Sequence, residues 1–301
     1  MSLINLFRLL LLSVLWSVSF LFLKLGASVF GAGILIEIRV FSAALLLTLI
    51  AWWMKRKLNF AEHKAHYFII GFFNLALPFT LFAYAAQSLD VSLMAVLNSS
   101  APILGALFSL IWLKTKLTPS IFLGLLLGVA GVVILSWDGL MVQNEIDWLP
   151  LLASLAGAAC YAIASVYTKK TSKTISPFDN ALGTLWAASL LMLPIALLIP
   201  IQHSPVAMDW VWALALGLLS TGLAFMIYFK IIEEEGPIKA LSVTFIIPVF
   251  GVLWGYGFLD ETIGWNLLIG GGLILLAVAL TNELIRFRFF KKSALNKPLD
   301  L

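Results

Sequence analysis

The chain has very little charge. Only 11% of its 301 residues are Asp, Glu, Lys or Arg, whereas 62% are hydrophobic. A soluble domain needs a polar surface, and roughly a quarter of its residues are normally charged. A chain that is apolar on every side of its helices is instead surrounded by lipid. The composition therefore excludes a soluble protein and indicates an integral membrane protein.

Residues for metal, redox or acid–base chemistry are also scarce. The single cysteine, Cys160, rules out a disulfide framework or a cysteine-rich metal site. The three histidines are assigned to loops, and there is no His-Glu-x-x-His pattern, phosphate-binding loop or repeated channel-filter sequence. We therefore expect no metal and no cofactor. A membrane-embedded enzyme remains as the alternative function, although the chain has no recognisable catalytic motif.

Long apolar runs are abundant. About 20 helical residues span the hydrocarbon core of a bilayer, and these runs are too uniformly apolar for the alternating strands of a membrane barrel. The sequence predicts an all-α fold with ten transmembrane helices. They lie near residues 3–25, 31–54, 66–87, 91–113, 119–137, 147–168, 178–200, 208–232, 238–259 and 264–286.

The basic residues mark one side of the membrane. All of the 19 lysines and arginines except Lys24 and Arg39 fall in the tails or in connections on the side of the N-terminus. By the positive-inside rule, both termini are cytoplasmic. The net charge of +4 then reflects membrane topology, so we expect a lipid bilayer and no nucleic acid as partner.

The two halves of the chain resemble each other. A shift of 146 residues aligns Pro102 with Pro248, Gly105 with Gly251 and Gly124 with Gly270. We predict repeats of five helices at residues 1–140 and 145–286, followed by a basic cytoplasmic tail at 287–301. Because five is odd, the second repeat is inserted upside down, and inverted repeats are typical of alternating-access carriers.

At these positions the chain resembles the drug/metabolite transporter superfamily, specifically ten-helix carriers with two EamA-type domains. The matching residues include Leu15-Trp16-Ser17, Lys24, Arg39, Ala83-Tyr84-Ala85, Ala101-Pro102-Ile103, Tyr161, Lys169, Tyr228, Ala240-Leu241 and Ile247-Pro248. Glu261 matches an acid that family members commonly have after the ninth span, whereas Thr115 replaces it in the first half. The resemblance implies a secondary carrier in the bacterial inner membrane, exporting amino acids or similar amphipathic metabolites.

Arg39 is a candidate substrate anchor. It lies inside the second apolar run, roughly 8 Å from the membrane surface at helical rise. A charge at that depth costs several kcal/mol unless it is paired or hydrated. We predict that Arg39 binds a substrate carboxylate or phosphate, and the alternative is a structural pair with Glu37 or with a helix end.

Prolines inside the fourth and ninth spans predict a second part of the site. Each proline leaves the carbonyl four residues earlier without its helical donor, and polar residues stand at those same positions. Free carbonyls and polar side chains at equal depth in both repeats are typical of a broken-helix binding site, with a simple kink as the alternative. The predicted residues are Asn98, Ser99, Pro102, Ser242, Thr244 and Pro248.

Aromatic residues away from the span ends are predicted to line the same cavity. They are Trp16, Tyr84, Tyr161, Phe225 and Tyr228. Aromatic walls suit an amphipathic substrate or a cation over a ring face, and ordinary helix packing is the alternative.

Glycine-rich stretches in the fifth and tenth spans predict close helix contacts. They are Gly124-x-x-x-Gly128 and Gly270-Gly271-Gly272. We expect them to pack within the monomer, with a homodimer contact as the alternative.

Overall fold

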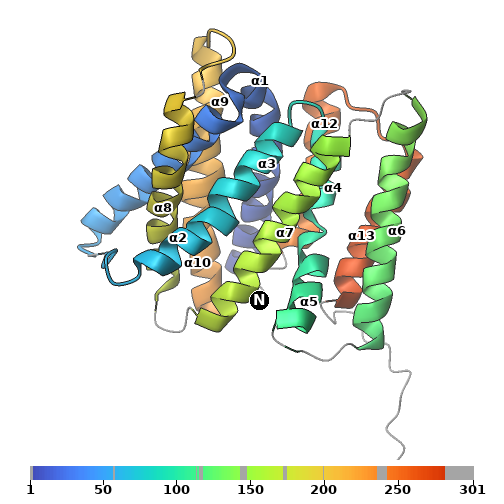
Figure 1. Cartoon of the computed structure of the whole chain (residues 1–301), viewed down its shortest axis with the longest axis horizontal. Coiled ribbons are helices and arrows are strands. Elements are labelled where there is room, and N and C mark those ends of the chain that lie inside the picture. Colours follow the sequence, from blue (N-terminus) through green and yellow to red (C-terminus); the bar gives the residue numbers. More distant parts are fainter. Residues whose placement is uncertain are drawn as a thin grey trace, which may run out of the picture.

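The computed structural model is a bundle of helices, and the residues that it describes contain no strand (Figure 1). It describes residues 3–56, 58–112, 114, 118–142, 148–171, 175–198, 200–235 and 243–281. The helices are α1 (Leu3–Trp53), α2 (Lys64–Ile70), η1 (Gly71–Ala76), α3 (Leu77–Ala85), α4 (Val91–Asn98), α5 (Ala101–Trp112), α6 (Pro119–Val142), α7 (Trp148–Thr171), α8 (Pro177–Leu198), α9 (Ala207–Gly217), η2 (Leu218–Leu223), α10 (Ala224–Glu235), α12 (Val243–Leu259) and α13 (Trp265–Thr281).

Each predicted apolar run is mainly helical over its described residues. Within the described residues, six continuous helical segments are long and apolar enough to cross a membrane, and three further apolar helices are shorter. The all-helical membrane fold is therefore confirmed, whereas the number of ten spans stays a prediction. The assignment of His66 to a loop was wrong, because His66 lies in α2, with its Nε2 2.8 Å from Asn180 Oδ1.

Gly31 divides α1 into the first two predicted runs. Its φ of 71° and ψ of 162° fall in a region that is essentially restricted to glycine. The backbone N–H groups of Gln202 and His203 both donate to the carbonyl of Val29 at 3.1 Å, which fixes the bend against the connection between α8 and α9. The two parts of α1 consequently run in different directions (Figure 1).

The apolar core is centred on α1. Phe30, Leu35 and Leu47 are fully buried there, in a cluster that includes side chains from α3, α4, α7, α8 and α9. A smaller cluster joins α4 and α5 to α13 around Ile103 and Ile274.

The helices α6 and α13, which are equivalent in the two halves, lie side by side at one edge of the bundle (Figure 1). A Cβ added at Gly131 would lie 2.8 Å from Ile274 and 2.8 Å from the carbonyl oxygen of Gly270, and one at Gly128 would lie 3.6 Å from Ala277. The two helices therefore run antiparallel, with glycines at their contact. Position 128 shifted forward by 146 residues is 274, and position 277 shifted back by 146 is 131. The contact 128/277 and the contact 131/274 are therefore equivalent in the two halves.

A second pair of contacts behaves in the same way. A Cβ at Gly71 would lie 3.1 Å from the backbone nitrogen of Ala188, and one at Gly217 would overlap the Ser42 hydroxyl. The 146-residue shift turns the first pair of positions into the second. The π-helical segments η1 and η2 also begin at positions that are equivalent to within one residue. The same local geometry thus recurs in both halves.

We predict that Gly31→Ala destabilises the folded protein by about 1–3 kcal/mol, the usual cost of a strained backbone conformation. The midpoint of thermal unfolding in detergent would measure this loss. Gly272→Ala is the matched control, since no atom lies within 4 Å of a Cβ there and alanine is favoured in a helix. Equal midpoints for the two variants would contradict the strain argument.

Candidate functional site: Arg39, the aromatic cluster and the α4–α12 contact

Arg39 is buried inside the bundle with only 5% of its surface exposed. Its Nε donates to Thr221 Oγ1 at 3.0 Å, and its guanidinium carbon lies 3.5 Å from the centre of the Phe79 ring. The Thr221 hydroxyl in turn donates to the carbonyl of Leu216, five residues earlier, at 3.1 Å. The π-helical segment η2 thus places a hydroxyl against the guanidinium, as π-helical turns often do at functional sites.

The structure does not pair Arg39 with Glu37. Instead, Ser189 Oγ donates to one oxygen of Glu37 at 2.7 Å, and the other carboxylate oxygen is buried without a hydrogen-bond partner. Across the described part of the chain, no acidic side chain forms an ion pair with Arg39. The pair between Arg39 and Glu37 is therefore not observed among the described residues.

Aromatic rings from three helices extend from Arg39. Phe79 contacts Tyr161 with 6.4 Å between ring centres, and Tyr161 stacks on Phe82 at 6.1 Å. Phe82 makes an edge contact with Phe20 of α1 at 5.5 Å. We call Phe20, Phe79, Phe82 and Tyr161 the aromatic cluster. Of these, only Tyr161 was predicted.

Trp16 lies one turn before Phe20 on α1 and joins the aromatic cluster to α10. Its ring centre is 5.2 Å from Tyr228 and 6.4 Å from Phe225. The structure thus shows two contact groups among the predicted residues, Arg39 with Tyr161 through Phe79, and Trp16 with Phe225 and Tyr228.

Tyr84 is separate from this group. Its side chain is 36% exposed on the outside of the bundle, although Phe82, two residues earlier, points inward. The prediction read the tyrosine as the inward-facing residue of α3. The helical period instead turns Phe79 and Phe82 toward the core.

The fourth span is broken at the predicted position. Here α4 ends at Asn98 and α5 begins at Ala101, with a turn at Ser99 and Ser100. Asn98 Oδ1 is buried and has no hydrogen-bond partner. Ser99 Oγ donates to the carbonyl of Ala95 at 3.2 Å. Pro102 follows in the first turn of α5, so the break leaves a buried amide oxygen free to bind a donor.

The ninth span is described in part. Pro248 is buried inside α12, where it has no N–H to donate to the helix. Ser242 lies outside the described residues, and the side chain of Thr244 is not described either. Both remain predicted site residues.

Glu261 connects the two halves. It follows α12, is 9% exposed, and accepts hydrogen bonds from the backbone N–H groups of Val91 at 2.6 Å and Ser92 at 3.0 Å. The Ser92 hydroxyl also donates to it at 2.6 Å. We call these three hydrogen bonds the Glu261 cap. Burial and the neighbouring Glu261 raise the pKa of Asp90, and Lys24 opposes this shift.

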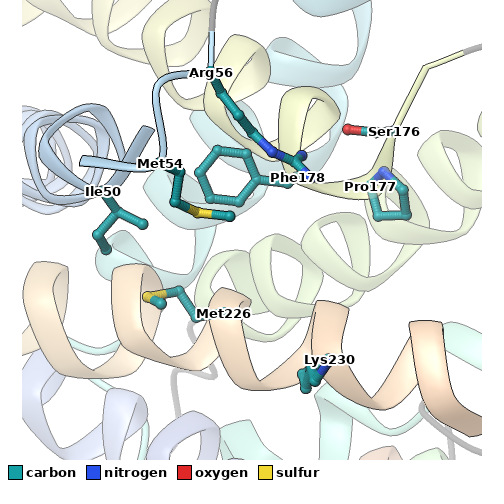
Figure 2. A pocket seen from close by; sticks show the side chains of 8 residues that line it. All are labelled: Ile50, Met54, Arg56, Ser176, Pro177, Phe178, Met226 and Lys230. Carbon is teal, nitrogen blue, oxygen red and sulfur yellow. The ribbon is translucent and has the colours of Figure 1, made fainter. Parts of the chain in front are cut away.

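A pocket of about 350 Å³ lies elsewhere, between the ends of α1 and α10 and the start of α8 (Figure 2). Figure 2 shows the Arg56 guanidinium beside the Phe178 ring, 5.4 Å from its centre. Met226 and Lys230 line it from α10. At helical spacing these two residues face away from Phe225 and Tyr228, and no residue of the aromatic cluster lines the pocket.

Several site residues were missed because nothing in their sequence distinguishes them. Phe79, Phe82 and Thr221 stand in apolar runs rich in similar residues, and Trp254, whose Nε1 donates to Ser17 Oγ at 2.8 Å, looked like another buried aromatic. The recurrence of Gly71 and Gly217 at the 146-residue shift was an available signal, since both mark the close contacts next to η1 and η2.

Comparisons with known proteins agree with this architecture. The model of the EamA-like transporter family matches the chain twice, at residues 3–137 and 148–283. The chain is 25% identical to the uncharacterized transporter YvbV of Bacillus subtilis, covering 90% of this chain and 89% of that protein. It is 24% identical to the protein PagO of Salmonella typhimurium, covering 82% and 84% respectively.

A solved crystal structure has the same fold, with a TM-score of 0.64 at 20% sequence identity, over 94% of this chain and 97% of that one. The relatives of this family are named transporters rather than enzymes. The two matches together span most of the sequence, and the chain therefore belongs to the EamA-like transporter family and is a multi-pass membrane transporter.

Proposed function

We propose that this transporter is a secondary carrier that exports small metabolites with an anionic group, such as amino acids or similar amphipathic solutes. The observation that supports it most directly is Arg39, a buried cation for which the described residues provide a hydroxyl and a ring but no carboxylate. A carboxylate or phosphate of the substrate would supply the missing negative charge.

The energetics favour this assignment. A buried charge costs several kcal/mol, and one hydroxyl and one aromatic face compensate only part of that cost. Binding of an anion beside Arg39 would replace this deficit with a charge-assisted pair. A purely structural arginine would be expected to have an acidic partner within the bundle.

The aromatic cluster suits the rest of such a substrate. Rings bury apolar groups and attract an ammonium group over their faces, so Tyr161 and Trp16 fit a solute with an apolar or cationic portion beside its anionic group. Asn98 adds a buried acceptor for a donor of the substrate. The names of YvbV and PagO specify no substrate, so the solute class rests on this chemistry.

Alternating access between two inverted repeats is the proposed mechanism. The contacts that exchange under the 146-residue shift, 128/277 with 131/274 and 71/188 with 42/217, support a twofold relation between the halves. Such a relation lets one half rock against the other around a shared site. We further propose a bacterial inner-membrane location with both termini in the cytoplasm.

The first prediction concerns Arg39. Arg39→Ala removes the proposed anchor and lowers the rate of amino-acid transport about tenfold or more, the effect of losing one charged hydrogen bond. Transport of a metabolite panel is measured in proteoliposomes with and without a pH gradient. Arg56→Ala is the control, because it removes another ring-stacked arginine outside the site. Unchanged transport, or loss of folded Arg39→Ala protein from the membrane, would favour a structural role.

The second prediction concerns the break between α4 and α5. Asn98→Ala weakens substrate affinity by roughly five- to a hundredfold, because a substrate donor loses its acceptor. The same change leaves the unfolding midpoint unaltered, since Asn98 Oδ1 has no internal partner to lose. Thr244→Val should weaken substrate affinity in the same way if the two halves are equivalent. Ser100→Ala is the control, because that hydroxyl donates to the carbonyl of Leu97, three residues earlier in the chain. Parent-like affinity of Asn98→Ala would rule out this part of the site.

The third prediction tests orientation. Single cysteines at positions 57 and 144 are introduced into a Cys160→Ala background and labelled in intact cells. A membrane-impermeant reagent outside the cell should modify position 144 and spare position 57. The reverse pattern would refute the proposed orientation of the repeats.

A further inference from the structure

The Glu261 cap replaces a cap that α4 does not make for itself. Asp90 occupies the residue before the first turn of α4, yet its side chain forms no capping hydrogen bond. The carboxylate of Glu261, 170 residues away in the other half, accepts both backbone donors of that turn instead. Lys24 Nζ donates to the carbonyl of Leu89 at 2.8 Å and holds the same connection from α1.

The cap closes one end of the contact between α4 and α12. A Cβ at Gly251 would overlap Ala95, so the two helices touch through small residues. A Cβ at Gly255 would overlap the Glu261 carboxylate, so this glycine leaves the space that the acid occupies. An anionic group at a helix N-terminus, buried and bound by three donors, is a strong local interaction.

The equivalent positions of the opposite halves lack the residues for such a cap. The 146-residue shift maps Glu261 onto Thr115, which has no charge, and maps Val91 onto Pro237, which has no N–H. This comparison concerns residue chemistry alone, since both positions lie outside the described residues. At the equivalent positions, both the acid and one of its two backbone donors are therefore absent.

We propose that Glu261 is a positioning residue that holds the carrier closed at the end of the bundle bearing Lys24 and Asp90. This inference rests on the proposed carrier function, and that end is the outer one in the proposed orientation. Release of the Glu261 cap separates α4 from α12 and admits solute from that side. Because Thr115 and Pro237 cannot form the equivalent cap, the Glu261 cap acts at one end of the bundle alone.

The test measures opening without relying on transport. Met94 of α4 is completely buried one turn from the Glu261 cap, so Met94→Cys in a Cys160→Ala background reports exposure of this contact to a thiol reagent in nanodiscs. Glu261→Gln should raise the labelling rate about tenfold, because one charged hydrogen bond is lost. Asp260→Asn is the matched control, since it removes the adjacent exposed charge at a positive φ that asparagine tolerates.

A second variant retains the Glu261 residue and disturbs only its position. Gly255→Ala displaces the Glu261 carboxylate without changing charge and should raise labelling in the same direction. Labelling of Glu261→Gln at the rate of Asp260→Asn would overturn the proposal, as would failure of both Glu261→Gln and Gly255→Ala to fold. If the parent protein transported nothing but the labelling response were intact, the proposed function would be refuted, whereas the role of the Glu261 cap in closing this contact would stand.

Discussion

The structure depends on the requirement that every backbone N–H and C=O be satisfied where no water is available. Regular helices meet this requirement within themselves, which is why the described chain is helical almost throughout. Departures are tolerated only where protein surrounds the backbone. The turn at Ser99 and Ser100 and the π-helical segments η1 and η2 are such departures, and each lies beside a predicted site residue or one of its partners.

Close approach of helices is the second requirement, because lipid gives apolar side chains no reason to prefer a protein neighbour. Small residues at Gly71, Gly131, Gly217 and Gly251 let backbones and side chains of neighbouring helices meet. The contacts at Gly71, Gly131 and Gly217 have equivalents under one sequence shift, whereas a Cβ at Gly105, the equivalent of Gly251, would have no atom of the described residues within 4 Å. Each of these contacts joins a residue of one half to a residue of the other, so the small residues hold the two halves together.

Two buried charges contrast in how they are satisfied. Glu261 has three donors and completes a helix terminus of the other half, so its charge stabilises the fold. Arg39 has one hydroxyl and one aromatic ring, so its charge is only partly compensated. We propose that in a low-dielectric interior this difference separates a structural ion, Glu261, from one that binds a ligand, Arg39.

The sequence by itself determined the membrane class, the helical runs, the repeat and the position of Arg39 within an apolar run, because hydrophobicity and spacing act locally along the chain. It also placed the break before Pro102, since proline always removes a donor. Only the tertiary structure decided that Phe79 rather than Tyr84 faces inward, that Thr221 rather than Glu37 binds Arg39, and that Glu261 caps α4. Those outcomes depend on helix rotation and on contacts between residues far apart in sequence, which an almost uniformly apolar sequence does not specify.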